Sequence, residues 1–274
     1  MKKSRLLALA AMALSLAFIG TYATTAESQA PTDAQVQTGT LSETVWHPTC
    51  PKKMATDITV KYPENTGNDQ VDAFFAEEAA KYLTIRKNEF LELEPYICEY
   101  NFRLYAKSGY KSFKPNPETL GVITSTESFT GGANSKITTQ SNNFDLITGQ
   151  EITIEDLFID PRMGISGIYG FAYADLCNKT ETHEAAWWVL TGKCGTDKKA
   201  PSKVLGLKGP LDKLGHLVLT ERGADLNFIA YEIWSYGQGS YTLSIPKDTL
   251  IEFGAMDFWG QSASHFWVPI DPSF

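Results

Sequence analysis

The chain has 274 residues, of which 24 are basic and 32 are acidic, so its formal net charge at neutral pH is −8. Aromatic residues make up 12% of it, and nearly all of them follow residue 45, which is enough for one large domain or two small ones. The excess of acidic residues disfavours binding to nucleic acid or to anionic lipid, and it favours either a basic partner or solubility alone. We therefore expect no nucleic-acid partner.

The first 26 residues have the three-part order of a secretory signal. Lys2, Lys3 and Arg5 precede an apolar run over residues 6–20, and small residues follow it. The run is about 15 residues long, whereas a membrane-spanning helix needs about 20. We therefore expect residues 1–26 to be a cleaved signal peptide, with no membrane anchor remaining after cleavage. Cleavage removes three basic residues and no acidic one, which lowers the net charge to −11. The predicted location is the bacterial periplasm or the cell exterior.

Four cysteines follow the signal, an even number that in an oxidising compartment indicates disulfide bonds. They are Cys50, Cys98, Cys177 and Cys194. Three pairings are possible, and proximity in the sequence favours Cys50–Cys98 with Cys177–Cys194. Because no CxxC or CxxH spacing occurs, we predict no metal site.

The N-terminal half of the mature chain begins with a linker and continues as a mixed segment. Residues 27–45 are rich in Thr, Gln, Ala and Ser, and we expect them to form a flexible linker. Asn68 or Asp69 caps a helix whose apolar residues recur at three- and four-residue intervals as far as Leu93. Alternating or apolar runs predict strands at residues 57–62, 100–107, 120–129, 135–144 and 151–154.

The C-terminal half repeats this order of helix and strands. Helical spacing covers residues 164–178, and strands are predicted at 217–220, 226–233 and 240–245. We therefore predict an α+β fold of two small subdomains, residues 46–150 and 151–274, each a mainly antiparallel sheet with a packed helix.

No catalytic motif emerges from the sequence. His183 begins a segment that resembles a zinc-protease helix, but Trp187 stands where the second histidine would be needed. The chain has no GxSxG motif, no phosphate-binding loop, and no GxGxxG between a strand and a helix. The acidic residues between the two halves suit turns and helix starts better than a glycosidase or calcium site, and they are Asp145, Glu151, Glu155, Asp156 and Asp160. We predict no catalytic residues and no cofactor.

An ordered series of segments resembles a known family of extracellular modules. The segments are Ser128-Phe-Thr-Gly-Gly-Ala-Asn134, Asn143-Phe-Asp-Leu-Ile-Thr-Gly-Gln150, Ile154-Glu-Asp-Leu-Phe158, Phe228-Ile-Ala-Tyr-Glu-Ile233 and Tyr236-Gly-Gln-Gly239. This series resembles the RsiV/PdaC-type modules, which form the lysozyme-sensing ectodomain of RsiV anti-sigma factors and the non-catalytic N-terminal part of a peptidoglycan deacetylase. The resemblance implies a PdaC-like N-terminal subdomain and an RsiV-like C-terminal one.

The same resemblance implies a binding function and a set of binding residues. We expect a non-enzymatic module that recognises a lysozyme-like muramidase or peptidoglycan through two hairpins. The family often has histidine where this chain has Asn134, so no titrating imidazole is available there. A cell-wall-directed hydrolase or esterase using carboxylates or His183, and an envelope structural protein, remain alternatives. The expected binding residues are Gly131, Gly132, Asn134, Trp234, Tyr236, Gln238 and Tyr241.

Overall fold

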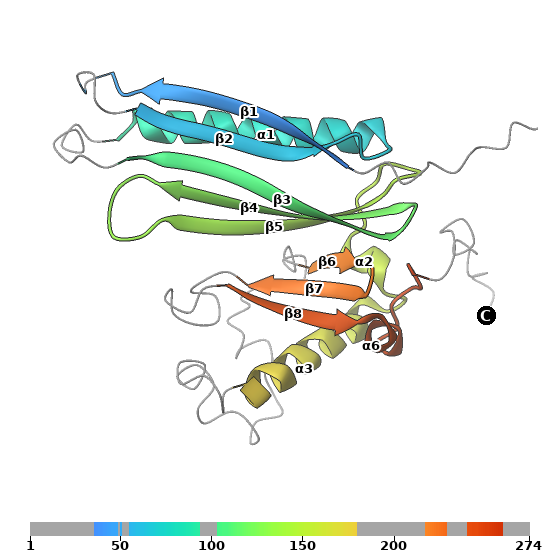
Figure 1. Ribbon diagram of the computed structural model, residues 1–274. Coiled ribbons are helices and arrows are strands. Elements are labelled where there is room, and N and C mark those ends of the chain that lie inside the picture. Colours follow the sequence, from blue (N-terminus) through green and yellow to red (C-terminus); the bar gives the residue numbers. More distant parts are fainter. Residues whose placement is uncertain are drawn as a thin grey trace, which may run out of the picture. The chain divides into compact units, whose positions relative to one another are not determined.

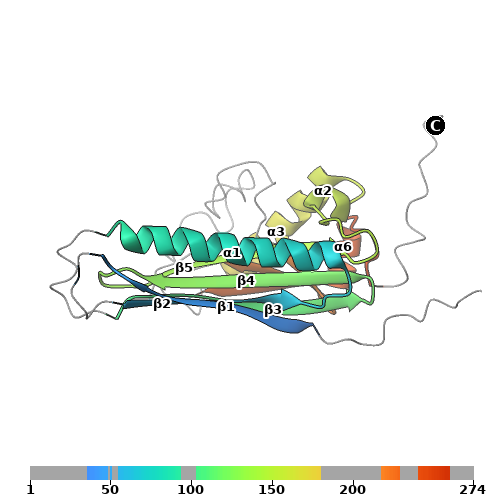
Figure 2. The same cartoon turned by 90° about the horizontal axis from the view of Figure 1, so that it is seen from above.

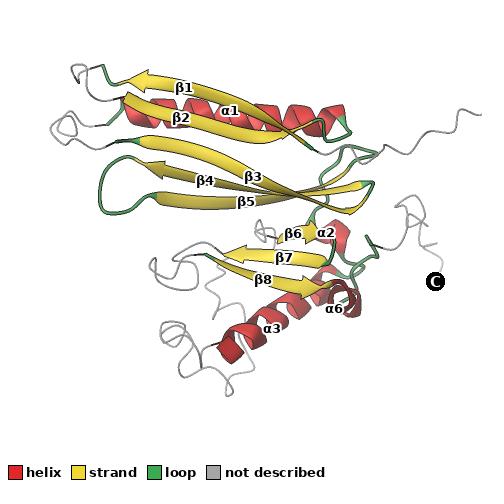
Figure 3. Cartoon of the chain, viewed as in Figure 1, coloured by secondary structure: helices red, strands yellow, loops and turns green. Residues whose placement is uncertain are grey.

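The computed structural model describes residues 36–48, 50, 55–93, 103–179, 217–228 and 240–259, apart from the side chains of residues 173 and 176–179. Contacts divide the chain into residues 1–30 and a compact unit of residues 31–274. The expected signal peptide therefore lies outside the described residues. Within them, no helix has both the length and the apolar character needed to cross a membrane. Figure 1 labels the elements, and Figure 3 colours them by type.

The larger sheet has five strands in the order of the sequence, β1-β2-β3-β4-β5. Every neighbouring pair is antiparallel except β2 and β3, which are parallel over the four residue pairs from Asp57–Tyr105 to Val60–Ser108. The strands are β1 (Gln37–Trp46), β2 (Ala55–Glu64), β3 (Tyr105–Asn116), β4 (Thr119–Phe129) and β5 (Lys136–Asp145).

Helix α1 (Asp69–Leu91) lies between β2 and β3 in the sequence and makes their parallel pairing possible, because parallel neighbours need a long crossover. Asn68 caps it by accepting hydrogen bonds from the backbone N–H groups of Gln70 and Val71. Figure 2 shows the helix along one side of the sheet. Two buried clusters join helix and sheet: Val71, Phe75, Leu120, Val122 and Phe144 in one, and Val45, Ile58, Val60, Ala79, Phe90, Leu104 and Ala106 in the other.

The smaller sheet is an antiparallel meander of β6 (Leu217–Thr220), β7 (Gly223–Phe228) and β8 (Tyr241–Pro246). It shares one core with three helices, α2 (Ile154–Leu157), α3 (Pro161–Lys179) and α6 (Lys247–Glu252). Both sheets with their packed helices confirm the predicted α+β class. Whether residues 46–150 and 151–274 can fold separately stays a prediction.

Two residues bring β6 against the larger sheet. A Cβ atom at Gly121 would overlap the backbone carbonyl oxygen of Leu219, so only glycine allows β4 and β6 to approach this closely. Asn143 on β5 donates to the Leu217 carbonyl oxygen at 3.0 Å and accepts from the Leu219 N–H at 2.7 Å. Both bonds are buried, and they give two backbone groups of β6 the hydrogen-bond partners that a neighbouring strand would otherwise supply.

Two local expectations were wrong. Residues 27–45 were expected to be a linker, but residues 37–46 form β1, whose ten residues all pair with β2 and whose Val45 enters the core. A low content of large apolar residues is tolerated there because β1 is an edge strand. Residues 151–154 do not form a full strand: Glu151 makes one bridge to Phe144, and a helix begins at Ile154.

One cysteine bears on the disulfide prediction. Cys50 is disulfide-bonded rather than a free thiol. Cys98 and Cys194 lie outside the described residues, as does the side chain of Cys177. The pairing therefore stays a prediction.

Candidate functional site

The face of the larger sheet opposite α1 is only partly covered. Side chains alternate along a strand, so the neighbours of the buried Leu104 and Ala106 on β3 point away from the helix. We call this surface the open face, and define it by Tyr105, Lys107, Gly109, Ser125 and Glu127. The smaller sheet lies against it near Gly121, where Ile123 is also buried, and β7 and β8 border part of the remainder.

A groove runs along the open face. It consists of a hollow of about 770 Å³ and a second one of about 420 Å³, and the two share Gly109 and Ser125. β2, β3 and β4 line the first hollow, while the second lies between β3 and the strands β7 and β8. The polar and charged lining residues are Asp57, Thr59, Lys61, Arg103, Tyr105, Lys107, Ser108, Tyr110, Lys111, Ser125, Thr126, Glu127, Thr139, Asp225, Asn227, Ser240 and Thr242.

Four basic residues line this groove together with three acidic ones, although the chain as a whole is acidic. Arg103, Lys107 and Lys111 recur every fourth residue along β3, so strand periodicity places all three on the open face. Lys61 joins them from β2. Arg103 has a carboxylate partner, Asp57, at 3.7 Å.

Glu127 is the centre of a hydrogen-bonded group at one end of the groove. It accepts from the Tyr105 hydroxyl at 2.6 Å and lies 2.7 Å from the Lys107 ammonium group. The bonds from Lys107 and then Tyr105 hold the pKa of the Glu127 carboxyl below its usual range. The same bonds raise the pKa of Lys107 and that of the Tyr105 hydroxyl, because each partner favours its protonated form beside the carboxylate.

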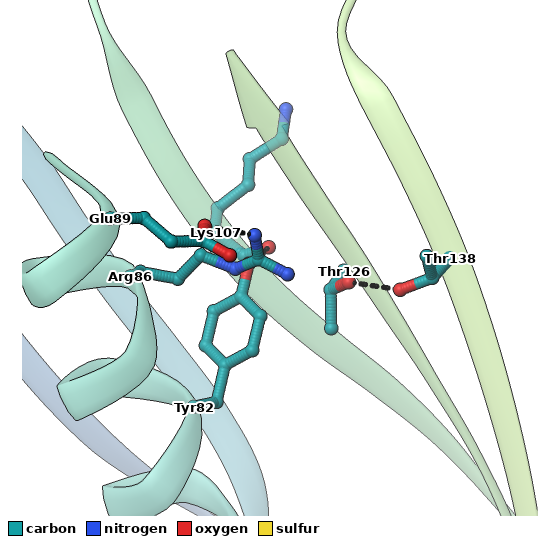
Figure 4. A network of polar contacts seen from close by, with 6 residues as sticks. All are labelled: Tyr82, Arg86, Glu89, Lys107, Thr126 and Thr138. Atoms are coloured by element: carbon teal, nitrogen blue, oxygen red, sulfur yellow. Dashed lines mark hydrogen bonds and ion pairs between the residues drawn. The ribbon is translucent and has the colours of Figure 1, made fainter. Parts of the chain in front are cut away.

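A second polar group lies on the helix side of the sheet (Figure 4). Arg86 stacks over the Tyr82 ring at 4.9 Å and forms an ion pair with Glu89 at 2.5 Å. Beside them, the hydroxyls of Thr126 and Thr138 hydrogen bond across β4 and β5 at 2.6 Å. Burial raises the pKa of Tyr82. The contacts of Arg86 lie within α1 and the threonine pair lies within the sheet. The Tyr82 hydroxyl joins the two by donating to the Lys107 carbonyl oxygen at 3.4 Å.

The structure places the expected hairpin residues at the exposed end of β4 and β5. Gly131 and Gly132 have φ angles of 104° and 105°, in the left-handed region that glycine readily adopts in a hairpin connection. Gly132 and Asn134 are exposed. The groove residues Glu127 and Ile137 pair across the two strands close below this tip, so hairpin and groove form one surface.

The second expected hairpin cannot be placed, because Trp234, Tyr236 and Gln238 lie outside the described residues. Tyr241 is described and is only 9% exposed. It stacks on Phe228, and its hydroxyl donates to Asp175. Tyr241 therefore belongs to the core of the smaller sheet, and the structure does not bring it together with the first hairpin.

The acidic residues between the two halves have local roles. Asp145 accepts from the N–H groups of Ile147 and Thr148 in a turn, as expected. Asp156 forms a capping box with Thr153, and Asp160 accepts from two N–H groups at the start of α3. Glu151 accepts from Asn142, Glu155 is exposed in the first turn of α2, and His183 lies outside the described residues. In the described part of the chain, no three His, Cys, Asp or Glu residues gather as metal ligands.

The groove was not predicted from the sequence. Residues 100–107 are predicted to be a strand, and Leu104 and Ala106 are buried while Arg103 and Lys107 are exposed, which is the alternation of a strand with one face in water. The overlooked signal was the continuation of that alternation, in which Gly109 and Lys111 follow Lys107 on the same face.

Comparison with solved structures identifies the fold. A DUF3298 family protein from Pseudomonas aeruginosa PAO1 aligns with a TM-score of 0.54 and 18% identity, over 82% of this chain and 96% of that one. A member of the same family from Bacteroides fragilis NCTC 9343 aligns with a TM-score of 0.52 and 18% identity, over 81% of this chain and 94% of that one. The fold is that of DUF3298 family proteins. No family model and no curated protein matches the sequence.

Proposed function

We propose that the protein is an exported, non-enzymatic binding module of the bacterial cell envelope, which recognises a lysozyme-like muramidase or peptidoglycan. The observation that carries this proposal is the surface formed by the exposed Gly131–Gly132 hairpin and the groove below it. A hairpin whose two strands are paired along almost their whole length can enter the cleft of a partner with a smaller loss of conformational entropy than an unpaired loop. A DUF3298-type fold is compatible with the RsiV/PdaC resemblance of the sequence.

The overall charge of the chain, rather than that of the groove, supports a basic protein partner. The net charge of −11 expected after signal cleavage attracts a basic lysozyme over distances up to the Debye length, which increases the association rate and makes it sensitive to salt. At the tip, Asn134 and the exposed backbone of the glycines offer hydrogen-bond donors and acceptors. These groups would occupy the glycan-binding cleft of the lysozyme and exclude its peptidoglycan substrate.

The test is calorimetric titration of residues 27–274 with a basic animal-type lysozyme and with purified peptidoglycan, while lysozyme turnover is followed in parallel. Asn134→Arg places a positive charge at the tip and should weaken lysozyme binding at least about tenfold. Gln150→Arg is the matched control, because it adds the same charge in the exposed turn at the other end of β5. Failure of the native protein to bind either ligand would overturn the proposal. Equal effects of the two variants would show that the hairpin is not the binding element.

A further inference from the structure

Gly109 is the floor of the groove at the point where its two hollows meet. A Cβ atom added there would have no heavy atom within 4 Å, so open space lies directly above this backbone. Its φ is not in the left-handed region, so the backbone conformation does not require glycine. The absence of a side chain at Gly109 leaves space in which a ligand can approach the backbone of β3.

Three lysines surround this floor. Lys107 and Lys111 lie two residues before and after Gly109 on β3, with Cα atoms about 6.6 Å away along the strand. Lys61 follows the last parallel pair, Val60–Ser108, by one residue, and it lines the same hollow as Gly109 from the neighbouring strand β2. Ser125 pairs with Gly109 from the opposite side, on β4.

The charges of these lysines are only partly balanced. Lys107 pairs with Glu127, but no described carboxylate lies within ion-pairing distance of Lys61 or Lys111. The chain has eight more acidic than basic residues, so two uncompensated lysines on one floor run against its overall charge. Neighbouring like charges repel each other, and an anion between them removes that cost.

We propose that the hollow over Gly109 binds a carboxylate or phosphate group of an extended anionic ligand. Lys61, Lys107 and Lys111 hold the anion, and the Ser125 hydroxyl donates to it from the fourth side. The groove continues in both directions from this point, so neighbouring units of a polymer can lie along β3. This inference rests on the proposed function in that it takes the groove to be part of a ligand-binding surface, and it adds the ligand class.

The experiment titrates residues 27–274 by calorimetry with three probes at low and physiological salt. The probes are soluble peptidoglycan fragments with free carboxyl groups, the same fragments with those groups amidated, and poly(glycerol phosphate). Binding to a carboxylate or phosphate probe should weaken as salt rises. Lys61→Gln and Lys111→Gln should each lower the affinity about tenfold.

Two further variants complete the design. Gly109→Leu fills the hollow and should abolish binding, while Gly109→Ala, which β-strands accept without strain, should weaken it. Lys81→Gln is the matched control, because Lys81 is an exposed lysine on α1 that pairs with Glu78. Circular dichroism of every variant establishes that it is folded.

The outcomes separate this inference from the proposed function. Binding of peptidoglycan that survives the Lys61, Lys111 and Gly109 substitutions leaves the proposed function standing and overturns the site over Gly109. Lysine-dependent binding of poly(glycerol phosphate) without any binding of lysozyme or peptidoglycan supports the site and overturns the proposed function. Loss of affinity on amidation identifies carboxylate as the bound group. Absence of binding to every anionic probe overturns the inference.

Discussion

Asn143 satisfies backbone groups that would otherwise be buried without partners. Its side-chain amide donates to the Leu217 carbonyl oxygen and accepts from the Leu219 N–H. The backbone carbonyl oxygen of Asn143 accepts from the Ile152 N–H. Removal of the side chain would leave two backbone groups of β6 unsatisfied, and each such group costs about 1–3 kcal/mol.

The first prediction is that Asn143→Ala lowers the free energy of unfolding by about 2–4 kcal/mol, measured by urea denaturation. Asn143→Asp should also destabilise, because a carboxylate cannot donate to the Leu217 carbonyl oxygen. Gln140→Ala, an exposed position on the same strand, is the control and should change stability by less than about 0.5 kcal/mol. Equal effects at positions 140 and 143 would contradict the role given to Asn143.

The ion pair between Glu127 and Lys107 makes a pH-dependent contribution to stability. The pKa of Glu127 is lowered on folding, so its contribution is present above the unfolded value of about 4.3 and is lost as pH falls through the folded value. The pKa of Lys107 is raised, so its contribution is present below about 10.4 and is lost as pH rises through the folded value.

The second prediction follows from the lowered pKa of Glu127 and the raised pKa of Lys107. Glu127→Gln should cost roughly 0.5–1 kcal/mol between about pH 5 and pH 10, since the pair is partly exposed, and the cost should disappear in acid. Denaturation of both proteins across this pH range measures the difference. In the native protein, carboxyl titration followed by NMR should show Glu127 below its usual pKa, and Lys107→Met should raise that pKa. A pH-independent difference would contradict the assignment.

At the scale of elements, the start of α1 is tied to the end of β5. The Asn68 side chain caps the helix through its oxygen, and its nitrogen donates to the Leu146 carbonyl at 3.0 Å. Gly149 packs so close to Asn68 and Gln70 that a side chain there would clash. One residue thus fixes both the beginning of the helix and its position over the sheet.

The third prediction separates these two roles. Asn68→Asp keeps the cap acceptor but loses the bond to Leu146, and it should destabilise by about 0.5–1 kcal/mol. Asn68→Ala loses both and should cost about 1.5–2.5 kcal/mol. Thermal and urea denaturation of the two variants test this order, and a larger loss for Asn68→Asp would contradict it.

The sequence predicted local elements better than it predicted their long-range contacts. The cap at Asn68, the glycines of the hairpin and the turn at Asp145 depend on neighbouring residues, so each could be recognised. β1 was missed because its stability comes from pairing with β2 rather than from its own apolar content. Tyr241 was assigned to a surface because aromatic composition alone does not distinguish an exposed ring from one stacked on Phe228.

At the scale of the whole molecule, the two sheets depend on each other where β4 meets β6. Gly121 permits the contact, and the Lys114 N–H on β3 supports it by donating to Glu221 at 3.0 Å. Because Gly121 and Leu219 are 98 residues apart in the sequence, and Lys114 and Glu221 are 107 apart, neither sheet retains its full environment when the other unfolds.

The fourth prediction is that residues 27–274 unfold in a single thermal transition, with equal calorimetric and van't Hoff enthalpies. Gly121→Val forces a side chain against the Leu219 carbonyl and should lower stability by several kcal/mol or split the transition in two. Gly170→Ala, at a position with open space around it in α3, is the control and should not destabilise. Two transitions in the native protein would instead favour separable domains.

The parallel pairing of β2 with β3 also has a consequence for the order of folding. β1 with β2, and β3 with β4 and β5, are antiparallel ribbons whose strands are close in the sequence. The parallel pairing of β2 with β3, which we call the seam, joins the two ribbons and must close a loop that contains all of α1. Closure of so long a loop costs more entropy than a hairpin, so the seam should be the last part of the sheet to form and the first to open. Lys61 lies on one ribbon and Lys107 and Lys111 on the other, so the anion site exists only while the seam is closed. A bound anion would therefore stabilise the paired state of β2 and β3, and it would slow hydrogen exchange along these two strands more than elsewhere in the sheet.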